Sequence, residues 1–230
     1  MHILLQVNHT ADSVANKTAA AQAPQEKGLI DLLIGGGPIM IPIALLSIAA
    51  IYVFVERYIS VRKSIHSDPH FLPAIRDHIQ SGNLKAARQL CEKNNTPLAR
   101  VISKGLTRVG RPLKEIEASM ENTGKIEMAR LEKRVPVLAI ISGAAPMFGF
   151  LGTVIGMMIA FNDIAAKGNI DITGIADGIN VKMVTSAAGL IVGIIAFFGY
   201  NILTIMIQKV VNQMETAALD FIEILEEPGH

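Results

Sequence analysis

The chain has 230 residues, half of them apolar, and a formal net charge of +1. Its single cysteine, Cys91, excludes an internal disulfide. The charged residues avoid three long stretches of the chain, so the sequence predicts an integral membrane protein and argues against a soluble one.

The first part of the chain predicts an external tail followed by one membrane span. Residues 1–37 form this external segment, and residues 1–27 of it are polar and rich in Ala, Asn and Gln. Leu29–Ile34 would extend the span or lie at the membrane interface, and the glycines at 35–37 break the chain before the span. Residues 38–55 carry no charge, which is close to the shortest length that spans a bilayer. This span is apolar on nearly every face, a pattern typical of a helix that faces lipid.

Residues 56–134 are too polar to cross a membrane and predict a helical region in the cytoplasm. They hold 16 Lys or Arg against 9 Asp or Glu, and positive loops stay on the cytoplasmic side. Turn signals divide the region into short helices over residues 71–80 and 84–93, and a third helix that follows Thr96. From Pro112 we expect one helix that continues without a break to Phe161, inside the next span.

Two further spans and a cytoplasmic C-terminal helix complete the prediction. Residues 135–161 and 181–208 are the second and third spans, joined by an external hairpin over residues 162–180. Apolar residues recur at helical spacing over residues 209–230, so the third span should continue as a helix below the membrane. The fold class is therefore an all-α membrane protein with three transmembrane helices and its N-terminus outside.

Small and hydroxyl residues form a stripe along each of the last two spans. The glycines of these stripes are Gly149, Gly152 and Gly156 in the second span and Gly189 and Gly193 in the third. Such stripes allow close packing of helices, and a hydroxyl-lined surface can also face a narrow wet lumen. Both interpretations stay open for the hydroxyls at Thr153, Thr185 and Ser186.

Three other residues of the spans have a structural and a functional interpretation. Asp177 and Lys182 flank the outer end of the third span, where they would reach the interface or lie at the mouth of a lumen. Pro146 interrupts the second span and predicts a kink, with a hinge as the alternative.

The sequence gives little support for an enzyme, a cofactor or a metal site. All six histidines lie outside the spans, and Pro69 disturbs the only helically spaced pair, His66 and His70. No phosphate-binding glycine loop or nucleophile motif is present, and the basic region lacks the interleaved aromatic residues of nucleic-acid-binding proteins.

The second span has the most specific sequence, APMFGFLGTVIGMM over residues 145–158, preceded by RLEK over residues 130–133. Together with TSAAGL over residues 185–190 and Tyr200-Asn201, it resembles the ExbB, TolQ and MotA proton-channel family, and ExbB most closely. The resemblance runs over residues 130–201.

This resemblance implies a proton channel of the bacterial inner membrane that drives a TonB-like protein for outer-membrane transport. It implies a homopentamer around two single-span helices of an ExbD-like partner subunit that carries an intramembrane Asp. The pore threonines of the family correspond to Thr153 and Ser186, and a family glutamate is replaced by Val181. A Tol or motility stator, or a scaffold that conducts nothing, remains the alternative.

Overall fold

A computed structural model describes residues 37–65, 70–167 and 172–226 of the chain. These residues form seven helices and no strand, so the all-α prediction is confirmed. In chain order the helices are α3 (Met40–Ile65), α4 (Phe71–Gln80), α5 (Leu84–Asn94), α6 (Pro97–Leu106), α7 (Leu113–Glu132), α8 (Val135–Lys167) and α9 (Ile172–Glu226).

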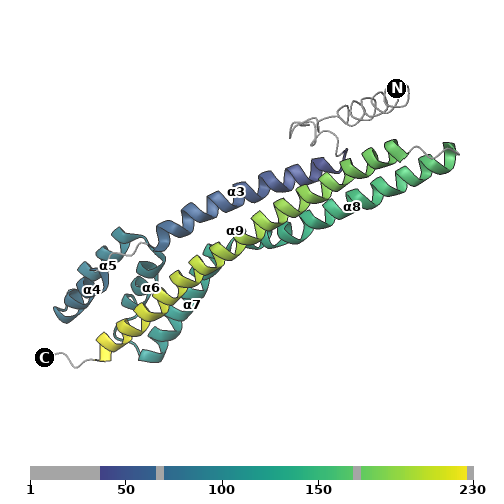
Figure 1. The fold of residues 1–230 in the computed structure, drawn as a ribbon. Helices are drawn as coiled ribbons and strands as arrows, with labels where there is room; N and C mark the ends of the chain where they lie inside the picture. Colours follow the sequence, from purple (N-terminus) through teal and green to yellow (C-terminus); the bar gives the residue numbers. More distant parts are fainter. Residues whose placement is uncertain (1–36, 66–69, 168–171, 227–230) are drawn as a thin grey trace, which may run out of the picture.

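The three predicted spans are confirmed as the three long apolar helices of the structure. Candidate membrane spans lie at Met40–Ile65, Val135–Ala166 and Lys182–Glu226. These helices run along one another at one end of an elongated molecule (Figure 1), and both α3 and α8 contact α9. Helices α4–α7 lie at the other end, where α4, α6 and α7 contact α9, and we call this part the α4–α7 region.

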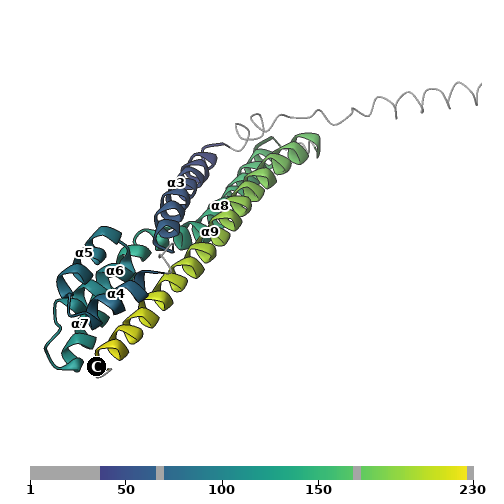
Figure 2. The ribbon, with the colours of Figure 1, turned by 90° about the vertical axis from the view of Figure 1, so that its left-hand side faces the viewer.

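The short helices of the α4–α7 region begin and end where the turn signals predict. The side chain of Asn83 accepts a hydrogen bond from the Ala86 amide at 3.1 Å, which caps the start of α5. Thr96 does the same for α6, since its hydroxyl accepts from the Ala99 amide at 3.2 Å. Figure 2 shows that these short helices lie beside α7 and the C-terminal half of α9.

Helix α9 runs through both the membrane part and the α4–α7 region, as the sequence predicts. Its 55 residues give it a length of about 80 Å, at 1.5 Å per residue. Beyond the third span it buries Val210, Met214, Ala217 and Phe221 at helical spacing. This face packs on α6 and α7, so one helix carries both the membrane part and the α4–α7 region.

The prediction of a single helix from Pro112 to Phe161 is wrong at one point. Helix α7 ends at Glu132 and α8 begins at Val135, with Lys133 and Arg134 in a turn between them. The physical reason is Pro136, because its ring has no amide donor and clashes with the carbonyl of residue 132 in a continuous helix. Arg134 has a φ of 69°, a conformation that costs a non-glycine residue roughly 1–2 kcal/mol.

The core of the α4–α7 region contains one buried carboxylate. Glu127 on α7 is 2% exposed, and its two oxygens accept from Arg100 on α6 and from Arg130, each at 2.6 Å. Close to this cluster of charges, Gly105 lets α6 approach its neighbours, since a Cβ there would lie 2.6 Å from Met120 Sδ and 2.7 Å from Phe221 Cε1. Helices α6, α7 and α9 are therefore in close contact.

Candidate functional site

The glycine stripes of the second and third spans lie against each other within one chain. A Cβ added to Gly189 would lie 2.6 Å from the carbonyl oxygen of Ala145, and one added to Gly149 would lie 3.0 Å from that of Ser186. Gly193 faces the ring of Pro146, whose Cγ would lie 2.6 Å from such an atom. Helices α8 and α9 therefore meet backbone to backbone, which only small residues allow.

Thr185 and Lys182 belong to the same contact. The side chain of Thr185 is fully buried, and its methyl group would lie 2.8 Å from a Cβ on Gly152. The carbon stem of Lys182 occupies the space that a side chain at Gly156 would need. Its ammonium reaches toward the start of α3, 3.6 Å from the position of a Cβ on Gly37. In the single chain both residues fill space between helices.

Thr153 and Ser186 lie to one side of this contact and are both partly exposed. Each follows a residue of the contact, Gly152 or Thr185, by one position, which is a rotation of about 100° on a helix. Because α8 and α9 run in opposite directions, the two rotations bring both residues to the same side. The Thr153 hydroxyl donates to the Phe150 carbonyl at 2.6 Å, so its lone pairs stay available as acceptors.

An apolar groove of about 890 Å³ runs along this side of α8 and α9. Ser186 supplies a hydroxyl to a lining that is otherwise apolar. The residues that line the groove are Ala144, Pro146, Met147, Phe148, Phe150, Leu151, Val154, Ser186 and Leu190.

Helix α3 packs elsewhere on the α8 and α9 pair. A Cβ on Gly199 would lie 3.0 Å from the ring of Phe54, and one on Gly152 would lie 3.5 Å from Ile39. Ile39 lies just before α3, and no residue of α3 lines the groove, so α3 leaves the surface at Ser186 open.

The groove contains no group that titrates near neutral pH. Residues 135–161 and 183–208, which line it, hold no Asp, Glu, His, Lys or Arg. Asp177 and Val181 both belong to α9, but the structure describes only their backbone and not their side chains. The described residues also hold no group of three or more His, Cys, Asp or Glu that could bind a metal ion.

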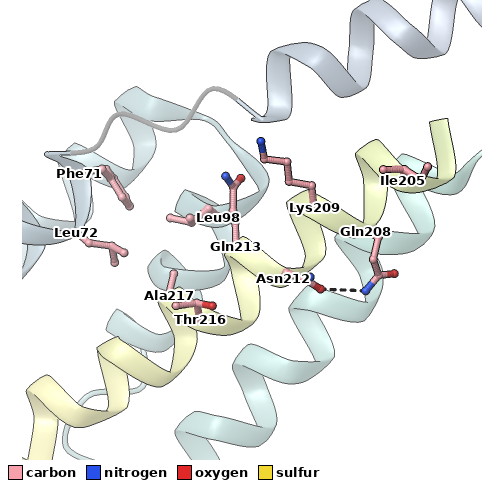
Figure 3. A pocket seen from close by; sticks show the side chains of 10 residues that line it. All are labelled: Phe71, Leu72, Leu98, Ile205, Gln208, Lys209, Asn212, Gln213, Thr216 and Ala217. Carbon is pink, nitrogen blue, oxygen red and sulfur yellow. Dashed lines mark hydrogen bonds between the residues drawn. The ribbon is translucent and has the colours of Figure 1, made fainter. Parts of the chain in front are cut away.

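A second cavity, of about 730 Å³, lies where α9 leaves its uncharged stretch (Figure 3). Phe71 and Leu72 of α4 and Leu98 of α6 form its apolar wall, and α9 supplies amides and Lys209. Among the described residues, Oε1 of Gln213 is buried without a hydrogen-bond partner. The cavity therefore combines an apolar wall with polar groups, and it lies apart from Thr153 and Ser186.

Sequence reasoning missed the ion pairs that hold the helices at the α7–α8 turn. Arg134 donates to Glu56, at the end of the uncharged stretch of α3, at 2.7 Å. No local pattern predicts this pair, because the two residues are 78 positions apart. Pro136, by contrast, is a local sequence feature that predicts the helix break at this turn.

Comparisons with known proteins place the chain in a family. A model of the MotA/TolQ/ExbB proton channel family matches residues 93–216. A biopolymer transport protein ExbB homolog of Methanothermobacter thermautotrophicus is 30% identical over 189 residues, which cover 81% of this chain and 67% of that protein. A biopolymer transport protein of Synechocystis, ExbB-like 1, is 31% identical over 187 residues, 78% of this chain and 72% of the relative.

A third relative comes from another branch of the same family. The Tol-Pal system protein TolQ of Haemophilus influenzae is 33% identical over 84 residues, 36% of this chain and 37% of its own length. The matched family region includes α8 and most of α9, the two helices that carry the glycine contact and the groove. The chain is therefore a multi-pass membrane protein that belongs to the MotA/TolQ/ExbB proton channel family.

Proposed function

We propose that this chain is the multi-helix subunit of a proton channel in the bacterial inner membrane. In this proposal five copies surround two single-span helices of an ExbD-like partner, and proton flow energises a TonB-like protein for outer-membrane transport. The observation that carries the proposal is the open groove that Ser186 lines and α3 does not. Thr153 is partly exposed on the same side of the α8–α9 contact, next to lining residue Val154. An apolar groove with a hydroxyl fits a transmembrane helix that brings its own polar group.

The chemistry of the groove assigns the titrating group to the partner. Hydroxyls both donate and accept hydrogen bonds, so they can hold water or meet a protonated carboxyl, but they store no proton at neutral pH. The last two spans contain no acid or histidine. The proposed partner helix therefore supplies an intramembrane carboxyl that faces Thr153 and Ser186.

The partner requirement predicts that the chain alone is nearly tight to protons. Purified chain is reconstituted into liposomes under an imposed potential, and proton flux is measured before and after addition of the single-span partner. Flux should rise only with the partner, because the partner brings the carboxyl. Equal flux in the two preparations would contradict the proposal.

The two hydroxyls are tested by the double variant Thr153→Ala, Ser186→Ala. Loss of hydrogen bonds to a charged or protonated carboxyl should lower partner-dependent flux about 10- to 100-fold, with assembly unchanged. Ser47→Ala is the matched control, because it removes a hydroxyl from α3, outside the groove lining. Full flux in the double variant would leave the two residues without a role in conduction.

The similarity to TolQ favours a second candidate, a stator of the Tol type. The groove and its hydroxyls would act in the same way there, and only the energised partner would differ. Co-purification separates the two candidates, since a TonB-like protein should bind in one case and a Tol-type partner in the other.

A further inference from the structure

The turn between α7 and α8 joins two parts of the chain that are each firmly packed. On one side, the buried carboxylate of Glu127 holds α7 against α6 through Arg100, at 2.6 Å. On the other side, α8 lies in backbone contact with α9 at Gly189. The conformation of the two-residue turn therefore affects how the second span is placed on the α4–α7 region.

Arg134 holds the backbone of this turn in an unusual conformation. Its φ of 69° lies in the left-handed region, which arginine rarely adopts. Its carbonyl accepts from the Val137 amide at 3.1 Å, in the first turn of α8. A conformation of this kind persists only where neighbouring contacts hold it, so the contacts of Arg134 decide whether the turn keeps its shape.

The side chain of Arg134 provides such a contact with α3. Its Nη1 lies 2.7 Å from Oε2 of Glu56, and the other oxygen of that carboxylate accepts from Arg57 at 2.7 Å. Arg57 thus fixes the carboxylate from within α3, and Arg134 binds it from the turn. The hydrogen bond to Glu56 raises the pKa of Arg134, and an arginine is charged throughout the physiological range even without such a partner.

We propose that Glu56 and Arg134 form a latch that holds the α7–α8 turn and so positions α8, with Thr153, on the α4–α7 region. Both residues are positioning residues, since neither lines the groove. In the single chain their side chains are 32% and 46% exposed, so the pair is only partly enclosed and the latch can open. Only its effect on proton flow rests on the proposed function.

The latch is tested by hydrogen exchange in the purified full-length assembly, at the peptide that contains the Val137 amide. Glu56→Gln and Arg134→Gln each remove one charge and keep a side chain that hydrogen-bonds. Each should speed exchange there about two- to fivefold, the factor that corresponds to loss of a partly exposed ion pair. The double variant should exchange no faster than the faster single variant, because both remove the same interaction.

Two variants serve as controls for this measurement. Arg134→Lys keeps the positive charge and should stay close to the unaltered protein. Glu121→Gln breaks the pair with Lys125, at 2.6 Å, within α7 and away from the turn, and should leave the peptide unchanged. Unchanged exchange in both Gln variants, additive acceleration in the double variant, or exchange in Arg134→Lys as fast as in Arg134→Gln would each overturn the latch.

Proton flux in the complex with the partner gives the second measurement. Arg134→Gln should lower flux about two- to fivefold, in line with the opened fraction of the latch, at an unchanged yield of assembled complex, and Arg134→Lys should restore it. If the Gln variants exchange faster but the unaltered complex conducts no protons, the proposed channel is refuted and the latch is supported. Normal exchange and full flux in the Gln variants would refute the latch and support the channel.

Discussion

At the scale of single residues, the glycines of α8 and α9 set how closely the two spans approach. A Cβ at Gly189 or Gly149 would meet backbone atoms, which cannot turn aside as a side chain can. At Gly156 the obstacle is the flexible stem of Lys182, which can move. Gly189 and Gly149 are therefore the positions where substitution should be most costly.

Gly189→Ala should destabilise the membrane part by about 1–3 kcal/mol, the usual cost of forcing a methyl group into a packed contact. The expected measurement is a lower midpoint of thermal unfolding in detergent. Gly143→Ala is the matched control, because nothing lies within 4 Å of its added Cβ and alanine favours a helix. Equal unfolding midpoints for the two variants would show that α8 and α9 are farther apart at Gly189 than in this structure.

The hydroxyl residues illustrate what sequence could distinguish at this scale. Thr185 and Ser186 are neighbours in the same motif, and both were candidates for a lumen. In the structure Thr185 is fully buried against Gly152, whereas Ser186 lines the groove. A rotation of about 100° separates them, and only the position of α8 decides which of the two turns inward.

At the scale of helices, ion pairs decide how the α4–α7 region is fastened together. Glu127 is the only acid in the buried core of the described residues, and it binds two arginines. The sequence predicted a helix from Pro112 but gave no reason to place a carboxylate on its inner face.

Glu127→Ala should destabilise the α4–α7 region by about 1–3 kcal/mol, because Arg100 and Arg130 lose their acceptor at a buried site. Limited proteolysis under increasing denaturant measures this change. Glu121→Ala removes an exposed pair with Lys125 on the same helix, which solvent screens, and should change stability little. If Glu127→Ala loses no more stability than that control, the buried ion pairs do not stabilise the α4–α7 region.

At the scale of the whole molecule, α9 joins the membrane part to the α4–α7 region, and charge bias predicts which end is inside. Native Cys91 is a poor reporter of this topology. It is 2% exposed, and burial raises the pKa of its thiol from 9.0 to about 11, which lowers the reactive thiolate fraction about 100-fold.

Exposed positions give a clearer test of the topology. Lys114→Cys lies on the surface of α7, and we expect an impermeant thiol reagent to reach it only after the membrane is opened. Ser13→Cys and Asn169→Cys should react from outside without that treatment, because the positive-inside rule places both segments there. Reaction of Lys114→Cys in intact cells whose outer membrane alone is permeable would reverse the orientation.

The sequence by itself determined the number of spans, the short helices and the family motif, and the role of the hydroxyls at Thr153 and Ser186 stays a prediction. Each of these depends on local properties: uncharged length, capping residues and spacing along one helix. Tertiary structure alone decided that the glycine stripes meet within one chain, that Thr185 is buried, and that Glu56 binds Arg134. These features depend on which helices become neighbours, and contacts between residues far apart in the chain leave no periodic signal in either segment.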